Sequence, residues 1–102
     1  MLTTTIVKGG VLAKDGHIYA VPSNAQGILR IDSRPDTQTK TAPYDPSRMS
    51  VIANHLPNIK DKWQGGFLVD NGYIYGIPEN CDRILEVRPP VNDESEVVVR
   101  ML

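Results

Sequence analysis

The chain has 102 residues, of which 40% are hydrophobic and 23% charged, a composition typical of one small globular domain. Eleven Lys and Arg residues against twelve Asp and Glu residues give a formal charge of −1. No summed positive field therefore favours nucleic acid or an anionic membrane as a partner. The single cysteine, Cys81, excludes an intramolecular disulfide and leaves the compartment open. Since the sequence has neither signal-peptide order nor the roughly 20 apolar residues that cross a bilayer, we take the cytoplasm as the default location.

The first half of the chain contains several stretches with the composition of β-strands, in order 3–7, 11–13, 17–21, 28–31 and 49–53. Asp15-Gly16 predicts a hairpin with a type I′ turn between the second and third stretches. Pro22 ends the next strand, because proline donates no hydrogen bond to a sheet. The polar segments 23–27 and 33–48 are expected to be surface loops.

The second half of the chain repeats the first. A shift of 56 residues aligns 7–34 with 63–90 without a gap, and 10 of the 28 positions are identical. The identical pairs are Gly9/Gly65, Gly10/Gly66, Leu12/Leu68, Gly16/Gly72, Ile18/Ile74, Tyr19/Tyr75, Pro22/Pro78, Asn24/Asn80, Ile28/Ile84 and Leu29/Leu85. The copy predicts strands at 67–69, 73–77, 84–87 and 96–101, with the glycine pair opening the first strand of each repeat.

Both copies carry the pattern Gly-Gly-x-Leu-x-x-(Asp/Asn)-Gly-x-Ile-Tyr-x-x-Pro-x-Asn-x-x-x-Ile-Leu, which is similar to the tandem repeats of kelch-like β-propeller proteins. The resemblance implies an all-β fold with two four-stranded antiparallel blades, 9–54 and 65–102, after a strand of a preceding blade at 3–7. A closed ring takes about four to eight blades. Three alternatives remain: a piece of a longer propeller, a subunit that completes a ring with copies of itself, or a small β-sandwich.

Residues that recur in both copies are interpreted as scaffold. We expect the glycine pairs to allow close backbone approach or to relieve a bend, and Tyr19 and Tyr75 to pack. Neither His17 nor His55 has the spacing of a metal ligand, and Cys81 has no activating partner in the sequence. The sequence therefore indicates no catalytic residue, metal or cofactor.

Binding residues are expected on the loops that share one end of the blades, 23–27, 54–64 and 79–83. The candidates for contact with a ligand or partner are Trp63, Arg83, Asn24 and Asn80. Packing between blades is the alternative role of Trp63, and turn stabilisation that of the asparagines.

The sequence thus favours a non-catalytic propeller segment that serves as a scaffold for a protein or a small molecule, and that could complete a ring as a homo-oligomer. The alternative is a fragment of a propeller-type enzyme, such as a lactonase-like hydrolase or an oxidoreductase, with its catalytic residues in further blades.

Overall fold

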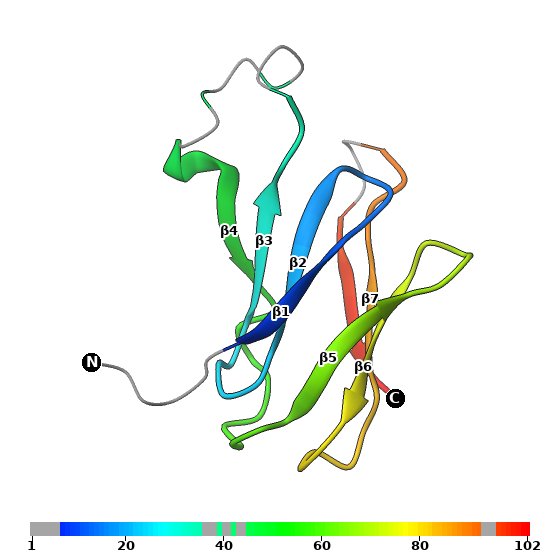
Figure 1. Cartoon of the computed structure of the whole chain (residues 1–102). Helices are drawn as coiled ribbons and strands as arrows, with labels where there is room; N and C mark the ends of the chain where they lie inside the picture. The colour runs from blue at the N-terminus through cyan, green and yellow to red at the C-terminus, as the bar shows by residue number, and fades with distance from the viewer. Residues whose placement is uncertain (1–6, 36–38, 40–41, 43–44, 93–95) are drawn as a thin grey trace.

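The computed structural model describes residues 7–35, 39, 42, 45–92 and 96–102. Its strands are β1 (Val7–Leu12), β2 (His17–Pro22), β3 (Ile28–Asp32), β4 (Met49–Ile52), β5 (Trp63–Leu68), β6 (Ile74–Pro78), β7 (Leu85–Arg88) and β8 (Val98–Met101). They form two antiparallel sheets of four strands, ordered β1-β2-β3-β4 and β5-β6-β7-β8 (Figure 1). A single turn of 3-10 helix, η1 (Pro46–Arg48), precedes β4. The predicted all-β fold with two tandem four-stranded sheets is confirmed. Among the described residues, no helix has the length and apolarity to cross a membrane.

The first strand of each repeat begins earlier than the sequence predicts. β1 starts at Val7 and β5 at Trp63, so the glycine pairs lie inside these strands. The strand pairing is irregular between Trp63 and Gly66, and Gly65 has a φ of +82°. A bulge with glycine in the left-handed region explains why the strand continues through this point. The strand expected at 3–7 falls outside the described residues, apart from Val7.

The hairpin turns are not of type I′. Gly16 has a φ of +79°, but Asp15 does not share the positive φ that a type I′ turn requires. The N–H of Gly16 donates to the Ala13 carbonyl over 3.1 Å, which gives a type I turn followed by a left-handed glycine. The physical reason is an Asx turn, because the Asp15 carboxylate accepts the N–H of His17 at 3.0 Å and stabilises this conformation. The same contact recurs 56 residues later, between the Asn71 side chain and the N–H of Tyr73.

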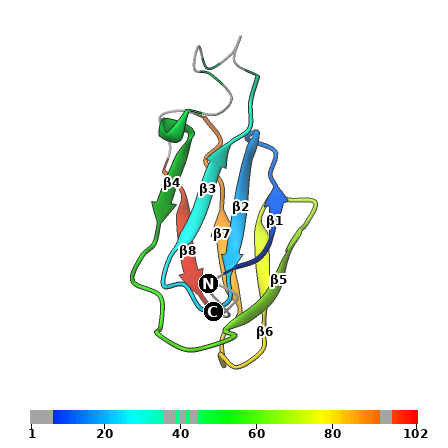
Figure 2. The same ribbon diagram turned by 60° about the vertical axis from the view of Figure 1, so that its left-hand side comes forward.

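The two sheets pack face to face, with β1 and β2 against β5 (Figure 2). A Cβ atom on Gly76 would lie 3.2 Å from Cγ1 of Val21 and 3.4 Å from the Trp63 ring. A Cβ atom on Gly66, the second glycine of its pair, would likewise lie 2.6 Å from Cγ2 of Val21, so the absence of side chains at these two positions lets the second sheet approach the first closely. Gly10 differs, because an added Cβ there would meet Ile18 of its own sheet. The fully buried apolar side chains of this single core are Tyr19, Val21, Ile28, Leu56, Trp63, Ile74, Leu85 and Val87.

Candidate functional site

The two predicted asparagines lie on either side of the connection between the sheets. The Asn24 side-chain oxygen accepts the N–H of Asp61 at 2.8 Å, and the Asn80 amide donates to the Lys60 carbonyl at 2.9 Å. Each asparagine therefore satisfies a backbone group of the connecting segment. These contacts hold the loops at one end of the sheets together.

Trp63 and Arg83 meet at the same end. The indole N–H of Trp63 donates to the Arg83 carbonyl over 2.7 Å, and the indole is fully buried. Burial of a side chain of this size stabilises the fold by roughly 2–3 kcal/mol. In this structure Trp63 offers no surface to a ligand, whereas the Arg83 side chain is exposed.

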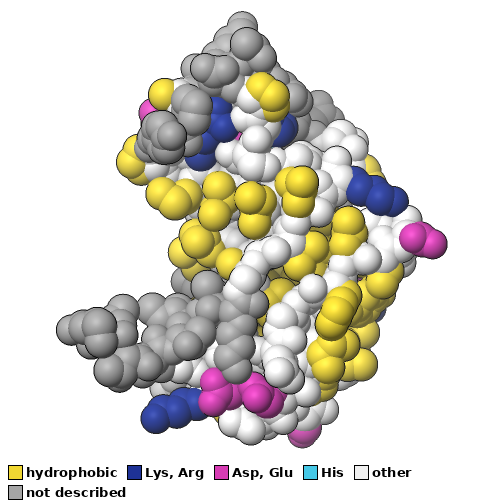
Figure 3. Space-filling view, in the orientation of Figure 1, with side chains coloured by type: hydrophobic (Ala, Val, Ile, Leu, Met, Phe, Trp, Pro, Cys, Tyr) yellow, Lys and Arg dark blue, Asp and Glu magenta, His cyan; other side chains and the backbone are white. Residues whose placement is uncertain are grey.

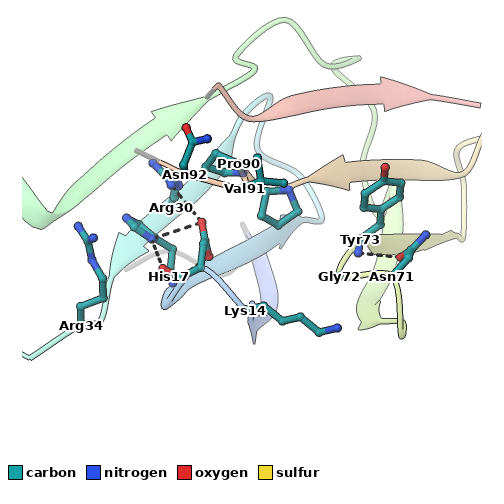
Figure 4. A pocket seen from close by; sticks show the side chains of 12 residues that line it. Lys14, His17, Arg30, Arg34, Asn71, Gly72, Tyr73, Pro90, Val91 and Asn92 are labelled. Carbon is teal, nitrogen blue, oxygen red and sulfur yellow. Dashed lines mark hydrogen bonds and ion pairs between the residues drawn. The ribbon is translucent and has the colours of Figure 1, made fainter. Parts of the chain in front are cut away.

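A pocket of about 540 Å³ lies at the opposite end, where the β1–β2 and β5–β6 turns meet (Figure 4). We name it the turn-end pocket. It is lined by residues of both repeats, at positions 14, 15 and 17, 71–73 and 89–92, together with Arg30 and Arg34. It is formed where the two sheets face each other, so neither repeat encloses it alone.

Asp15 is the centre of a hydrogen-bonded triangle at the pocket wall. Tyr19 donates its hydroxyl proton to Oδ2 of Asp15 over 2.6 Å, and Arg30 Nη2 donates to the same oxygen over 3.1 Å. Arg30 Nε also donates to the Tyr19 hydroxyl over 2.9 Å. Burial, together with the Asp15 hydrogen bond, raises the pKa of Tyr19 far above its usual value. The tyrosine therefore stays protonated and holds the Arg30 guanidinium in place.

The imidazole of His17 lies between two carboxylates. Its Nδ1 is 3.4 Å from Oδ2 of Asp15, and its Nε2 is 3.8 Å from Oδ2 of Asp32. Arg34 donates to both oxygens of Asp32, over 2.8 and 2.7 Å. The hydrogen bond from Arg34 lowers the pKa of the Asp32 carboxyl well below its usual range. Each acidic group at this wall thus has at least one cationic neighbour.

The second repeat builds the corresponding network with exchanged charges. Tyr75 donates its hydroxyl to Oε2 of Glu86 over 3.0 Å, while Arg88 and Arg100 donate to Oε1 over 2.7 and 3.1 Å. Burial opposes ionisation of Glu86, yet the bonds from Arg88 and Tyr75 hold its pKa below the usual value. The guanidinium of Arg88 also lies 4.8 Å above the ring of Tyr73.

The sequence does not predict the turn-end pocket, although the repeat carries a signal for it. Arg30 aligns with Glu86, and Asp32 aligns with Arg88. Opposite charges at equivalent positions show that these sites are not fixed by the strand scaffold, in contrast to the recurring tyrosines. Such positions are candidates for a binding role that only one repeat has. Arg30 lines the pocket, and Asp32 lies beside it through its contacts with His17 and Arg34.

Cations predominate among the charged groups of the pocket. Lys14, Arg30 and Arg34 line it, against the single carboxylate of Asp15. The Lys14 ammonium donates to the Asp70 carbonyl over 2.7 Å, which ties one turn to the other, and within the described part of the chain it forms no ion pair. No group of three or more His, Cys, Asp or Glu side chains among the described residues could hold a metal ion. The side chains of the pocket can therefore donate hydrogen bonds to a negatively charged group.

Comparison with protein-family models, with curated proteins and with solved structures gives no match for this chain. Its function is therefore inferred from the pocket and the repeat.

Proposed function

We propose that this chain is a non-catalytic binding module made of two propeller-type blades, and that a small organic anion occupies its turn-end pocket. The blade assignment is supported by the tandem order of two four-stranded antiparallel meanders and by the kelch-like pattern that both repeats carry. The ligand class is inferred from the side chains that line the pocket.

The observation that carries this proposal is the placement of two cations with unused donors. Lys14 has three N–H groups and donates one of them to the Asp70 carbonyl. Arg30 uses Nε and Nη2 in bonds to Tyr19 and Asp15, which leaves Nη1 without a partner among the described residues. A carboxylate placed between them would accept charge-assisted hydrogen bonds from both. Because both cations are already held by the protein, little side-chain entropy is lost on binding.

The size and walls of the pocket favour a small molecule. A volume of about 540 Å³ lies within the range of about 300–1,000 Å³ that is usual for ligand pockets. Pro90 and Val91 supply apolar surface beside the basic groups (Figure 4). This combination suits a short carbon skeleton with one or two carboxylates, such as a dicarboxylic acid.

The hydrogen bonds of Asp15 and Tyr19 at the wall of the turn-end pocket favour a binding role over a catalytic one. Asp15 already accepts hydrogen bonds from Tyr19, Arg30 and the backbone of His17. Tyr19, with its raised pKa, is a poor proton donor. The hydrogen bonds of Asp15 and Tyr19 hold the Arg30 guanidinium in position at the pocket.

Isothermal titration calorimetry with succinate, citrate and inorganic phosphate tests the proposal, with glucose as an uncharged comparator. We expect binding of at least one carboxylate, and a Lys14→Ala variant that binds it about 5- to 10-fold more weakly because one charge-assisted hydrogen bond is lost. Lys60→Ala is the matched control, since it removes the same charge from an exposed position away from the pocket. Equal weakening by both variants, or binding of glucose alone, would contradict the proposal.

A further inference from the structure

Each sheet has two chemically different faces, because cross-strand partners point to the same side. The tyrosine face of the first sheet comprises Val11, His17, Tyr19, Val21, Ile28 and Arg30. The glycine face of the second sheet comprises Gly66, Leu68, Ile74, Gly76, Leu85 and Val87. Inside the chain, the tyrosine face of the first sheet packs on the glycine face of the second, with Val21 against Gly66 and Gly76.

The repeat places a second glycine face on the outer side of the first sheet. Its residues are Gly10, Leu12, Ile18, Ala20, Leu29 and Ile31. The exposure of its side chains differs from that of the equivalent residues in the covered copy. Ile18 and Leu29 are partly exposed, whereas Ile74 and Leu85, which align with them, are fully buried, and Leu12 is 60% exposed against 40% for Leu68. Val51, which pairs with Leu29 from β4, is 65% exposed. Figure 3 shows the resulting band of hydrophobic side chains over β1 to β4.

The second sheet likewise has a tyrosine face on its outer side, against which no further strand packs in the described part of the chain. Its residues are Phe67, Tyr73, Tyr75, Ile77, Ile84 and Glu86. Phe67 is 58% and Ile77 44% exposed, while Val21, which aligns with Ile77, is 1% exposed. Apolar, aromatic and charged residues occupy the same positions on both tyrosine faces. The uncovered face therefore retains the chemistry of one that packs against a glycine face.

We propose that the two uncovered faces bind each other between copies of this chain. The tyrosine face of the second sheet of one copy covers the glycine face of the first sheet of the next copy. In this contact Ile77 takes the place that Val21 has inside the chain, and Gly10 and Ala20 take the places of Gly66 and Gly76. The interface between copies then continues the interface within each copy, and in a closed ring every sheet is covered on both sides.

This contact is head-to-tail, because unlike faces meet. A two-fold dimer would instead join two glycine faces or two tyrosine faces. Two glycine faces would lack the bulky side chains that fill the space above the glycines in the internal interface. Two tyrosine faces would bring Glu86 and its arginine partners against the same groups of another copy. The internal interface thus favours the head-to-tail arrangement, which leads to a ring or to an open chain of copies. The inference does not depend on the ligand of the turn-end pocket.

Light scattering after size-exclusion chromatography tests the proposal with one double variant for each face. Leu12→Glu with Val51→Glu changes the outer glycine face, and Phe67→Glu with Ile77→Glu changes the outer tyrosine face. All four side chains are at least 44% exposed, so the fold should tolerate the changes. Ile59→Glu is the control, because Ile59 is 42% exposed but lies in the connection between the sheets. Circular dichroism reports whether each variant keeps its strands.

We expect the wild-type chain and the Ile59→Glu variant to have masses above one chain that rise with concentration. Each double variant alone should have the mass of one chain, and an equimolar mixture of the two should form a species of twice that mass. The mixture decides the arrangement, because each variant keeps one intact face and together they can form one head-to-tail contact. A wild-type chain that stays monomeric, or a mixture that does not associate, would overturn the proposal. If a double variant unfolds, its single changes Val51→Glu and Ile77→Glu serve in the same mixture.

Discussion

The side chain of Val21 lies directly against the backbone of Gly66, and a Cβ atom on Gly66 would stand 2.6 Å from Cγ2 of Val21. Gly66 does not have a positive φ, so its need for glycine comes from space and not from backbone conformation. This contact sets how closely the two sheets approach.

Gly66→Ala should therefore lower the free energy of unfolding by about 1–3 kcal/mol through overpacking. Val21→Ala alone should also destabilise, because it leaves a cavity. The two changes combined should cost less than the sum of the single changes, since the smaller residue 21 makes room for the new methyl group. A double-mutant cycle from urea denaturation measures the coupling. Strictly additive effects would show that the two residues do not touch.

Gly72→Val tests the conformation of the second hairpin turn. Gly72 has a φ of +88°, and the nearest atom to an added Cβ is 3.6 Å away, so strain and not collision decides the outcome. A β-branched residue at this φ should lower the free energy of unfolding by roughly 1–3 kcal/mol. Gly72→Asn is the matched control and should cost less, because asparagine tolerates the left-handed region. An unchanged denaturation midpoint for the valine variant would mean that the turn is wrongly placed.

Arg34→Gln tests the ion pair with Asp32. The folded pKa of Asp32 is below that of the unfolded chain, so its contribution to stability is complete above about pH 4 and is lost as the pH falls through the folded pKa. The variant should be less stable by about 1 kcal/mol at neutral pH, and the difference from the wild type should shrink in acid. Urea denaturation at several pH values measures this. Arg83→Gln, at an exposed arginine, should show no such pH dependence.

Trp63 is the single tryptophan and provides a direct optical test of the site assignment. Because its indole is fully buried, we expect emission at short wavelength and little quenching by iodide in the folded chain. Titration with succinate should leave the emission unchanged, since the turn-end pocket lies at the opposite end of the sheets. A large change in emission on ligand binding would place the ligand at Trp63 and not at Lys14.

Features that depend on neighbouring residues could be predicted from the sequence. Alternating apolar residues in β3, the glycine after Asp15, and the end of β2 at Pro22 each reflect forces that act over a few positions. The prediction of a type I′ turn is wrong because the Asp15 carboxylate accepts a hydrogen bond from the backbone N–H of His17. The Asp-Gly pattern does not reveal this competing local contact. The predicted close approach is confirmed at Gly66, which Val21 contacts, while Gly9 and Gly65 have positive φ values.

The sequence by itself determined the duplication and the four strands of each repeat, because hydrophobic periodicity and turn residues act locally and recur after 56 positions. The tertiary structure decided which polar and charged side chains lie together. The turn-end pocket exists because the turns that contain Lys14 and Asn71 come together when the sheets pack, a contact between residues far apart in the chain. The same packing buries Trp63 and leaves Arg30 facing the pocket. Burial and convergence of this kind follow from how two sheets fit together, which local sequence does not encode.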